Sequence, residues 1–477
     1  MGYILDQNFL PEKYFEAICQ IPHGSYHEKP LSDYLVRFAE QHGLRCRQYE
    51  NWNVIIYKPG SEGYEEHPPL MLQAHIDMVC EKEDGVTHDF EKDPLSIYVE
   101  NGELRARGTT LGADDGVGVA YMLSLLEDDR IPHPPLECVF TVQEEVGLIG
   151  SRDLVFEDIT AKRMIGLDDM GGDTCYVTSC GSQHVSASRD YIMAEPAGRA
   201  YRVEVSGLTG GHSGVCISRE KGNAIKLTAR VLRMLSRHSA LRICRIDGGG
   251  KDNAIPVRCS TLFTSDLSFS NLLLLIQQME EAFRAELEFS DPGVTLELSE
   301  DHVTETMTEM HSNELIQFLY LFPDGFRHKS MKIPTLTTAS ENLANIRTEN
   351  GRVTIRSFAR SEQDSYLDQM EEEVRILSDI YGFVPEFQNR APGWKYTEHS
   401  EIRNILFSSY RKVTGREMKP LAEHGGLETG YISGGIPGID IATFGPRCEG
   451  YHTPQERLNL ASFRENYEVL KEALSRM

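Results

Sequence analysis

Short apolar runs alternate with longer amphipathic segments over the first ~185 residues of the chain. The runs are too short for helices and rich in aliphatic residues, so they predict buried strands. These strands are Val54–Tyr57, Leu70–Ile76, Leu136–Val142 and Arg163–Leu167. Helices are predicted over Leu31–Glu40 and Val117–Leu126, and the second has so few charges that we expect it to be buried. Strands that alternate with helices indicate an α/β fold with a mainly parallel, covered sheet.

The pattern changes to that of an α+β unit after about Tyr176. Strands are predicted at Val203–Ser206, Arg242–Asp247 and Thr261–Ser265, with helices at Ala224–Leu235 and Leu273–Leu287. The strand Arg352–Ala359 and the helix Ser365–Leu377 repeat this pattern, which suggests two related α+β sub-units. The α/β pattern returns with the helix Ile402–Thr414 and the strand Ile439–Phe444. We therefore expect a discontinuous domain of residues 1–187 and 390–477 and an inserted domain of residues 188–389.

Two local signals concern turns and caps. Asn101–Gly102 separates two short runs of strand character, which is a strong signal for a β-hairpin. Ser25 and Glu28 have the spacing of a capping box at the start of the helix through Leu31.

Composition limits the classes of partner and compartment. The net charge of −25 and the pI near 5.1 argue against nucleic acid or an anionic membrane surface as partners. The N-terminus lacks the pattern of a secretory signal, and the longest aliphatic run, Leu272–Ile276, is far too short to span a bilayer. The ten cysteines are scattered, as in a cytoplasmic protein with reduced thiols.

Histidine and acidic residues stand at the ends of the predicted core strands or in the loops that follow. These residues are His75, Asp114 with Asp115, Glu144 with Glu145, Asp168 and His452. Ligands bind beyond the carboxyl ends of the strands in sheets of this kind. Several carboxylates gathered there would repel one another unless one or two divalent cations were bound. Two imidazoles with several carboxylates suit zinc, with manganese or cobalt as alternatives.

Each of these features also has a simpler structural explanation. His75 and Asp77, two residues apart on one face of a strand, could form a hydrogen-bonded core pair. Asp114 could cap the helix that follows it, and Glu144 with Glu145 could face a helix dipole. Their occurrence together, each at a strand end, favours a metal site with Asp77 as the partner that orients His75.

The motifs that carry these residues resemble those of the M20 di-zinc metallopeptidases. They are Leu72-Gln73-Ala74-His75-Ile76-Asp77, Gly112-Ala113-Asp114-Asp115-Gly116, Gln143-Glu144-Glu145-Val146-Gly147, Leu167-Asp168 and Gly450-Tyr451-His452. Within that family the chain is most similar to the aminoacyl-histidine dipeptidases. The further motifs of this likeness are Gly207-Leu208-Thr209-Gly210-Gly211-His212-Ser213-Gly214, Asn253-Ala254-Ile255-Pro256 and Gly425-Gly426-Leu427-Glu428. The resemblance covers essentially the whole chain.

The resemblance implies a fold and a set of metal ligands. The fold would be a split catalytic domain of the zinc-exopeptidase, phosphorylase/hydrolase-like type, with an inserted α+β lid. Two divalent ions, zinc by this resemblance, would be held by His75 with Asp168 and by Glu145 with His452. Asp114 would bridge them, and the family's cis peptide would follow it. Many relatives carry Asn where this chain has Asp115, which leaves open which of the two aspartates is the bridge.

The implied reaction is hydrolysis of a short dipeptide, Xaa-His such as carnosine among them. The metals would lower the pKa of a water, and Glu144 would act as general base and then as acid. His212 would stabilise the oxyanion. The residues implied to bind the substrate are Asn223, Asn253, Arg360 and Glu428. The inserted domain would close over the dipeptide as a lid.

Three alternatives stay open at this stage. A deacylase of N-acyl amino acids and a carboxypeptidase would use the same fold. A non-catalytic metal-binding scaffold belongs to a different class, and Glu144 argues against it because a metal store needs no spare base. The resemblance also leaves open whether the chain forms a homodimer.

Overall fold

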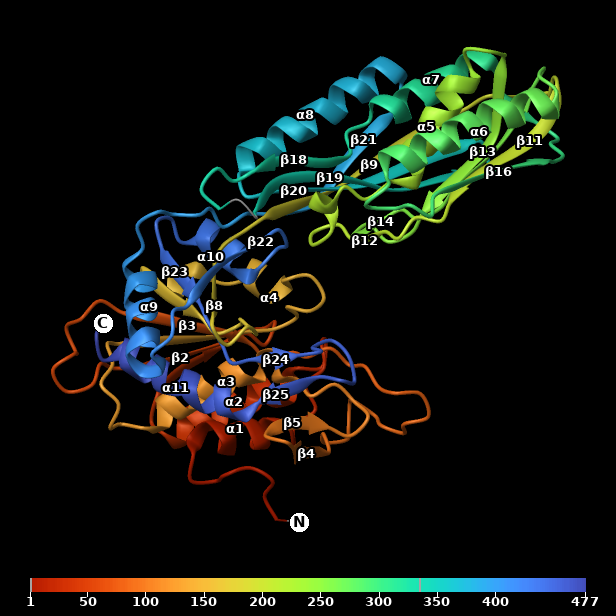
Figure 1. Cartoon of the computed structure of the whole chain (residues 1–477). Helices are drawn as coiled ribbons and strands as arrows, with labels where there is room; N and C mark the ends of the chain where they lie inside the picture. The colour runs from red at the N-terminus through yellow and green to blue at the C-terminus, as the bar shows by residue number, and fades with distance from the viewer. Residues whose placement is uncertain (1, 334–335) are drawn as a thin grey trace. The chain divides into compact units, whose positions relative to one another are not determined.

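The computed structural model describes residues 2–333 and 336–477. The chain divides into two compact units (Figure 1). The first unit comprises Met1–Thr178, Tyr396–Ala422 and Leu427–Met477. The second comprises Ser179–Lys395 and Glu423–Gly426. The fold is therefore an α/β unit interrupted by an insertion, as the sequence predicts.

The first unit is built on a 6-stranded sheet in the order β1-β2-β6-β3-β7-β23. Its strands are β1 Arg45–Gln48, β2 Val54–Lys58, β3 Leu70–His75, β6 Leu136–Thr141, β7 Arg163–Gly166 and β23 Asp440–Thr443. Neighbours among β6, β3, β7 and β23 are parallel, whereas β1 and β2 form an antiparallel edge. Every residue of β3 and β6 is buried, as expected for central strands of a covered sheet.

The helices of the first unit pack on this sheet and on one another. They are α1 Leu10–Ile18, α2 Lys29–Gln41, α3 Ala113–Glu127, α4 Ile149–Arg152, α9 Glu401–Thr414, α10 Glu428–Gly435 and α11 Leu460–Leu474, with a 3₁₀ turn at Phe156–Asp158. Helix α3 lies against β3, α2 against β1 and β2, and α9 against β7 and β23. Almost all of α3 is buried, which confirms the expectation from its lack of charge.

Smaller sheets complete the first unit. One contains four strands in the order β24-β25-β5-β4, with bounds Cys448–Glu449, Arg457–Asn459, Glu103–Ala106 and Ile97–Glu100. Asn101 and Gly102 connect β4 to β5 with φ values of 52° and 80°, so the predicted hairpin is confirmed. The other sheet pairs β8 Thr174–Ser179 with β22 Lys419–Glu423.

The second unit contains a 9-stranded sheet whose neighbouring strands are all antiparallel. In spatial order its strands are β16 Thr295–Glu300, β11 Arg199–Ser206, β15 Cys259–Ser265, β13 Leu241–Gly249, β19 Thr337–Glu349, β20 Arg352–Ser361, β9 Gly181–Asp190 and β21 Val384–Ala391, with β18 Gly325–Lys329 beside β19. Two short ribbons pair β10 Met193–Ala194 with β17 Thr306–Met307 and β12 Gly211–His212 with β14 Ala254–Ile255.

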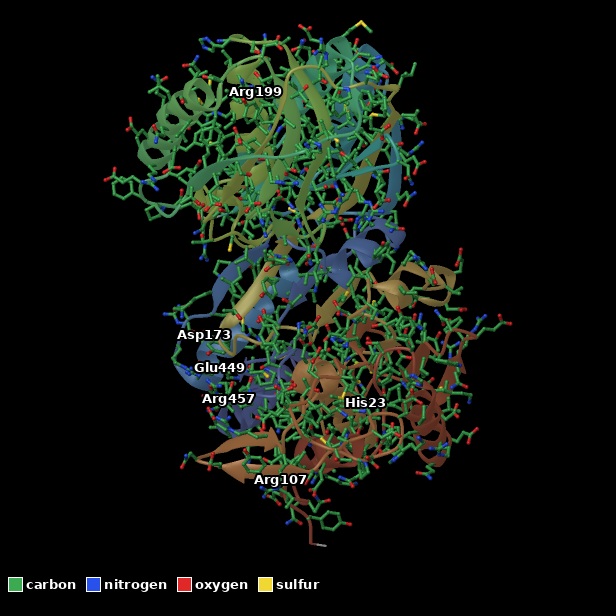
Figure 2. The ribbon with its side chains drawn as sticks, turned by 90° about the vertical axis from the view of Figure 1, so that its right-hand side faces the viewer. His23, Arg107, Asp173, Arg199, Glu449 and Arg457 are labelled. Atoms are coloured by element: carbon green, nitrogen blue, oxygen red, sulfur yellow. The ribbon has the colours of Figure 1, made fainter. Side chains whose placement is uncertain are left out.

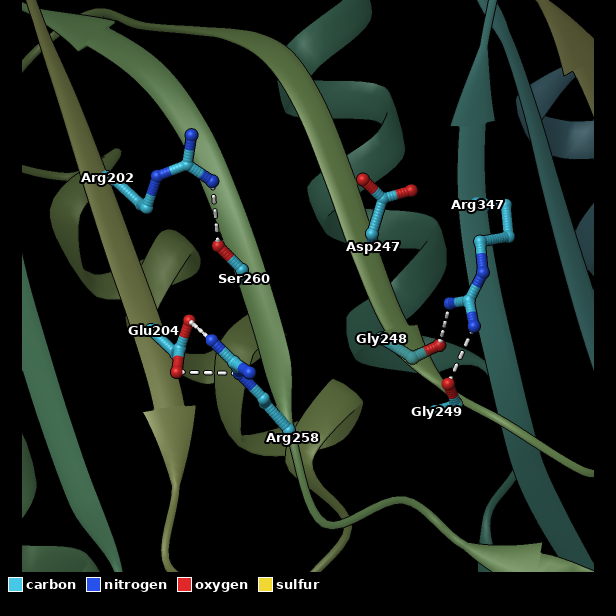
Figure 3. Close-up of a pocket in the computed structure, with 8 residues that line it drawn as sticks. All are labelled: Arg202, Glu204, Asp247, Gly248, Gly249, Arg258, Ser260 and Arg347. Carbon is cyan, nitrogen blue, oxygen red and sulfur yellow. Dashed lines mark hydrogen bonds and ion pairs between the residues drawn. The ribbon is translucent and has the colours of Figure 1, made fainter. Parts of the chain in front are cut away.

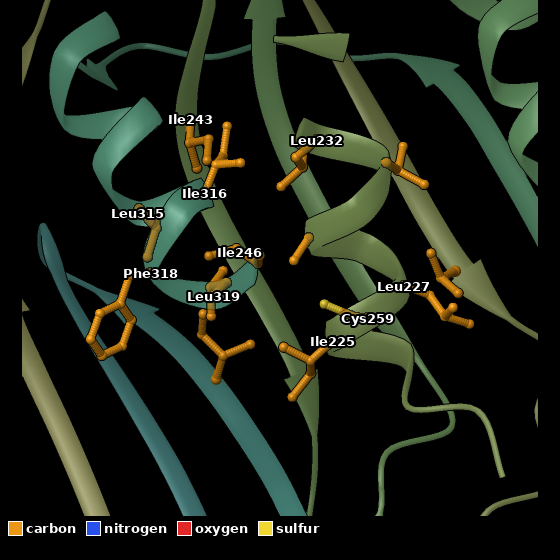
Figure 4. Packing of buried hydrophobic residues seen from close by; sticks show 14 of the residues in the cluster. Ile225, Leu227, Leu232, Ile243, Ile246, Cys259, Leu315, Ile316, Phe318 and Leu319 are labelled. Atoms are coloured by element: carbon orange, nitrogen blue, oxygen red, sulfur yellow. The ribbon is translucent and has the colours of Figure 1, made fainter. Parts of the chain in front are cut away.

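Four helices lie along one face of this sheet (Figure 1). They are α5 Ala224–Leu235, α6 Phe269–Glu286, α7 Glu309–Leu321 and α8 Asp364–Tyr381, with a 3₁₀ turn at Ile217–Arg219. Ile225 and Leu232 of α5 pack with Ile243 of β13 and Ile316 of α7 in one core (Figure 4). Because the sheet and this core are continuous, the insertion is one compact unit, and the two related sub-units within it stay a prediction.

The boundaries of the insertion differ from those expected. The sequence-based boundary at residue 187 falls inside β9, which pairs with β20 and β21 along its length and therefore belongs to the second unit. The chain re-enters the first unit at Tyr396, and the short segment Glu423–Gly426 also belongs to the second unit. Cys180 holds that segment, because its N–H donates to the carbonyls of Glu423 and Gly425 at 3.2 and 3.0 Å.

The other face of the second unit's sheet is polar and carries a pocket of about 320 Å³ (Figure 3). Its arginines already have partners. Arg258 forms an ion pair with Glu204 at 2.7 Å, and Arg202 donates to Ser260 at 3.2 Å. Arg347 donates to the carbonyls of Gly248 and Gly249. These guanidinium groups therefore stabilise the sheet face itself.

All ten cysteines are free, in agreement with the sequence-based expectation. Among the helices that the structure describes, none has the length and apolar character needed to cross a membrane.

Candidate metal centre

The order of the parallel strands explains why three of the predicted ligands lie close together. His75 is the last residue of β3, Glu145 lies just after β6, and Asp168 lies just after β7. Since β6, β3 and β7 are adjacent and parallel, their carboxyl ends meet at one edge of the sheet. The imidazole of His75 is 1% exposed there. The sheet thus brings together residues that are up to 93 positions apart in the sequence.

Asp114 and Asp115 stand at the start of α3, where the backbone is not yet helical. Gly112 precedes them with a φ of 68°, a backbone conformation that residues other than glycine rarely adopt. The peptide between Asp114 and Asp115 is cis, at the position that the family resemblance implies. The Asp114 carboxylate lies at this edge of the sheet, beside His75.

The Asp114 carboxylate lies between the two histidines. Its Oδ1 is 3.1 Å from Nε2 of His75, and its Oδ2 is 3.2 Å from Nε2 of His452. Asp115 is placed differently, because its Oδ1 accepts a hydrogen bond from the N–H of Gly118 at 3.1 Å. The geometry therefore favours Asp114 over Asp115 as the bridging residue.

The remaining ligand atoms converge on the same place. Nε2 of His452 is 3.0 Å from Oε2 of Glu145. Three groups of possible ligand atoms each lie within 4.8 Å of one another. They are His75 with Asp114 and Asp168, Asp114 with Glu145 and His452, and His75 with Glu144 and Glu145. The first two groups are the ligand sets that the sequence predicts, and they share Asp114.

The electrostatics of this cluster fit bound cations. Among the residues that the structure describes, no lysine or arginine pairs with Asp114, Glu145 or Asp168. Burial, followed by the nearby Asp114, raises the pKa of Asp168 well above its usual range. The buried Oε1 of Glu145 has no hydrogen-bond partner. Carboxylates that lie beside imidazoles and lack a lysine or arginine partner are a donor set that suits divalent ions.

Asp77 supports the cluster through the backbone of the turn after β6. Its Oδ1 accepts a hydrogen bond from the N–H of Glu144 at 2.9 Å, and its Oδ2 accepts one from Glu145 at 3.2 Å. Nδ1 of His75 lies 3.0 Å from the main-chain carbonyl of Asp77 and 3.5 Å from its carboxylate. Asp77 is thus placed to orient the imidazole and to hold the turn that carries Glu144.

Ser25 and Glu28 do not form the predicted capping box. Glu28 precedes α2 without a side-chain cap, and its Oε1 accepts hydrogen bonds from the N–H groups of Tyr26 and Gln143 at 2.9 and 3.2 Å. Ser25 donates to Oδ2 of Asp77 at 2.8 Å. The local spacing is that of a capping box, but partners distant in sequence compete for both side chains. Both residues support the turn after β6.

Glu428 lies in the first unit against the carboxyl-terminal parts of β3 and β6. Its Oε2 accepts hydrogen bonds from Thr141 at 2.9 Å and from Gln73. Its Oε1 is buried without a partner. Burial raises the pKa of Glu428 to about 7, although the nearby His75 opposes this shift. One carboxylate oxygen is therefore left for a polar ligand.

His212 lies in the second unit on the ribbon of β12 and β14, opposite Ala254. Its Nδ1 accepts a hydrogen bond from the N–H of Gly214 at 3.2 Å. Burial and the nearby Arg360 lower the pKa of His212. A neutral imidazole that accepts at Nδ1 carries its proton on Nε2, so Nε2 is available as a donor.

Arg360 lies on β20 of the second unit and is 5% exposed. Its guanidinium packs over the ring of Phe358 at 4.5 Å, and its Nε has no hydrogen-bond partner. Burial lowers the pKa of Arg360. A buried guanidinium with an unsatisfied donor is suited to an anionic ligand such as a carboxylate.

The two asparagines of the second unit differ from each other. Asn223 caps α5 by accepting from Ile225 and Lys226, and its amide donates to Asp324 at 2.8 Å and to the carbonyl of Leu343 at 2.9 Å. These bonds use both donors of the amide, so the geometry gives Asn223 a structural role. Asn253 is exposed, and its main-chain carbonyl accepts a hydrogen bond from the N–H of Ser213 at 2.8 Å.

Sequence reasoning missed Glu456. This buried carboxylate accepts hydrogen bonds from the backbone of the loop that leads into Asp114. The only signal in the sequence is its position four residues after His452 in the same loop.

The chain is similar to known peptidases over nearly its whole length. The chain matches the model of peptidase family M20/M25/M40 over residues 71–476. It is 31% identical to the cytosol non-specific dipeptidase of Escherichia coli over 464 residues, which is 96% of each chain. The structure matches that of aminoacylhistidine dipeptidase from Vibrio alginolyticus with a TM-score of 0.92 and 30% identity, covering 98% and 96% of the two chains. The aminopeptidase PepT from Bacillus cereus, at 17% identity and a TM-score of 0.57, shares the fold over 99% of each chain.

The chain therefore belongs to peptidase family M20/M25/M40, and the resemblance seen in its sequence is confirmed. It is a hydrolase of peptide bonds. The family is metal-dependent, and the cluster around Asp114 supplies candidate ligands.

Proposed function

We propose that this peptidase is a dipeptidase with two zinc ions that hydrolyses short dipeptides, Xaa-His among them. The observation that carries the proposal is the position of the Asp114 carboxylate, with one oxygen beside His75 and the other beside His452. His75 and Asp168 would hold one ion, and Glu145 and His452 the other. Manganese or cobalt would suit the same donors.

The metal ions, when bound, supply Lewis acidity that makes a water nucleophilic near neutral pH. Glu144 accepts the proton of that water at its carboxylate and returns it to the leaving amine. Burial raises the pKa of Glu144 well above its usual range, and the two bound cations would lower it again, so that Glu144 could accept a proton as the carboxylate. Asp77 holds the backbone of Glu144 and so aims this carboxylate.

Residues other than the proposed metal ligands would recognise the substrate. Nε2–H of His212 donates to the carbonyl oxygen as negative charge develops on it. Arg360 binds the carboxylate of the C-terminal residue, because Nε of its buried guanidinium lacks a hydrogen-bond partner. We retain Glu428 as the partner of the free amine and Asn253 as a weaker contact. Asn223 is omitted because its amide is already engaged.

The substrate class is supported by two relatives. One is named a non-specific dipeptidase and the other an aminoacylhistidine dipeptidase, and both match nearly the whole chain. The relative from Escherichia coli is named as cytosolic, which supports a cytoplasmic location for this protein.

Homodimer formation stays a prediction that light scattering in solution can measure.

The experiment is a substrate panel on protein stripped of metal and reloaded with zinc, manganese or cobalt. The panel contains carnosine, other Xaa-His dipeptides, dipeptides without histidine, longer peptides and N-acyl amino acids. We expect hydrolysis of free dipeptides and a loss of at least about 100-fold in kcat for Glu144→Gln. Hydrolysis of N-acyl amino acids alone would establish a deacylase, and trimming of longer peptides a carboxypeptidase.

A further inference from the structure

Glu456 holds four consecutive backbone N–H groups with one buried carboxylate. Its Oε2 accepts from Leu111 at 2.7 Å and from Gly112 at 3.0 Å. Its Oε1 accepts from Ala113 at 2.8 Å and from Asp114 at 3.4 Å. A carboxylate has about four lone-pair sites, so these four bonds use its full capacity.

The segment that Glu456 holds is the one that positions Asp114. Gly112, in its left-handed conformation, turns the chain into α3, and Asp114 follows two residues later. A glycine turn is conformationally permissive, so its geometry needs to be fixed from outside. The charge-assisted bonds to Glu456 are the strongest type available to these N–H groups.

Glu456 itself belongs to the loop that carries His452. This loop joins β24 to β25, and Glu449 pairs with Arg457 across the two strands, both as backbone neighbours and as an ion pair (Figure 2). His452 has a φ of 62°, which is uncommon for a residue other than glycine. Within the loop, the N–H of Glu456 donates to the carbonyl of Thr453 at 3.1 Å.

The Glu456 side chain therefore links two segments that are about 340 residues apart, one ending in Asp114 and the other containing His452. The imidazole of His452 is 3.2 Å from Asp114, so these two residues meet where the two segments meet. We propose that Glu456 is a positioning residue for the metal centre, which sets the distance between Asp114 and His452. This inference rests on the proposed function, because it assumes that both residues hold metal.

A residue that only stabilises the fold would have the same burial, so a matched control is needed. Glu137 provides it, because its carboxylate is buried in the first unit and accepts from the N–H groups of Thr160 and Ala161 at 3.0 Å each. It lies in β6 four residues before that strand ends, and it belongs to none of the possible ligand groups. Glu137→Gln thus removes the same kind of interaction without touching a ligand segment.

The experiment compares Glu456→Gln, Glu456→Asp and Glu137→Gln with the parent protein. Zinc affinity is measured by competition with a chromophoric chelator, and thermal unfolding is followed with and without zinc. We expect zinc affinity to fall by about 10- to 100-fold in Glu456→Gln, the range found when groups that orient metal ligands are removed. The substituted amide turns one acceptor into a donor that faces N–H groups.

Glu456→Asp keeps the charge but is one methylene shorter, so its zinc affinity is expected to lie between those of the parent and Glu456→Gln. It also keeps the test valid if the glutamine variant fails to fold. Glu137→Gln is expected to lower the unfolding temperature of the metal-free protein and to leave zinc affinity within about twofold of the parent. In the hydrolysis of a dipeptide at saturating zinc, Glu456→Asp should lower kcat and change KM little.

Equal zinc affinity in the parent and both Glu456 variants would overturn the inference. So would an equal loss in Glu137→Gln, because the effect would then be one of general stability. The titration needs no substrate, so it separates two failures. A parent protein that binds no zinc, manganese or cobalt would contradict the proposed function, whereas a metal-binding parent with unaffected variants would contradict the role of Glu456 alone.

Discussion

The carboxylate of Asp77 accepts a hydrogen bond from the backbone N–H of Glu144 at 2.9 Å. Together with the bond from Glu145, it fixes the turn that carries the proposed base and one proposed ligand. We predict that Asp77→Ala lowers kcat or zinc retention by about 10- to 100-fold while the far-ultraviolet circular dichroism stays that of a folded protein. If Asp77→Ala were fully active and bound its full complement of metal, the role of Asp77 would be limited to packing in the core.

Arg360 is predicted to bind the carboxylate of the substrate. Replacing it by lysine keeps the charge but removes the planar fork, so we expect KM for a dipeptide to rise by roughly 30-fold, or about 2 kcal/mol, with a smaller change in kcat. The matched control is the same dipeptide with a C-terminal amide. The parent and Arg360→Lys should hydrolyse the amide equally poorly, and a large difference between them would place the role of Arg360 elsewhere.

Asn223 is predicted to act in stability and not in binding. Asn223→Ala removes the cap of α5 and the bonds to Asp324 and Leu343, so the free energy of unfolding in urea should fall by about 1–3 kcal/mol. Ser268→Ala, which removes only the cap of α6, should cost less. Both variants should keep the kcat/KM of the parent below their unfolding temperatures. A large loss of kcat/KM with unchanged stability would restore a substrate role for Asn223.

Glu341 in the second unit gives a prediction for the pH dependence of stability. Burial raises its pKa to about 7, and the hydrogen bond from Ser357 only partly opposes this shift. The folded state therefore favours the protonated acid. The associated stability is present below the unfolded pKa and is lost as the pH rises through about 7.

Glu341→Gln mimics the protonated acid, so the variant should be more stable than the parent by about 3 kcal/mol at pH 8 and equally stable near pH 4. Urea unfolding at the two pH values measures this difference. Glu297→Gln, at an exposed position of β16, serves as the control and should show no such crossover. The prediction would be contradicted if the difference in unfolding free energy between Glu341→Gln and the parent were the same at pH 4 and pH 8.

The gathering of the proposed ligands in one place could be predicted from the sequence, because several of them follow strands of a parallel sheet. Residues at the ends of adjacent parallel strands must meet at one edge, which predicts that His75 and Asp168 lie near each other. That the two would hold the same ion is implied by the family resemblance alone. Glu456 could not be found in this way. Its partners are backbone N–H groups, which leave no trace in residue identity, and they lie more than 340 positions away.

Local patterns failed where distant partners compete for the same side chains. Ser25 and Glu28 have the spacing of a capping box. However, Ser25 donates to the carboxylate of Asp77, and Glu28 accepts from the backbone N–H of Gln143. The domain boundary at residue 187 was wrong for a similar reason, because β9 continues through it and is defined by its pairing with β20. Neither partner can be read from the neighbouring residues.

The central claim is that Asp114 bridges two metal ions. Anomalous diffraction at the zinc absorption edge from crystals of the zinc-loaded protein tests it most directly. The account predicts two peaks, one in contact with Oδ1 of Asp114 and Nε2 of His75, the other in contact with Oδ2 of Asp114 and Nε2 of His452. A single peak in a fully active protein, or two peaks that do not share Asp114, would contradict it.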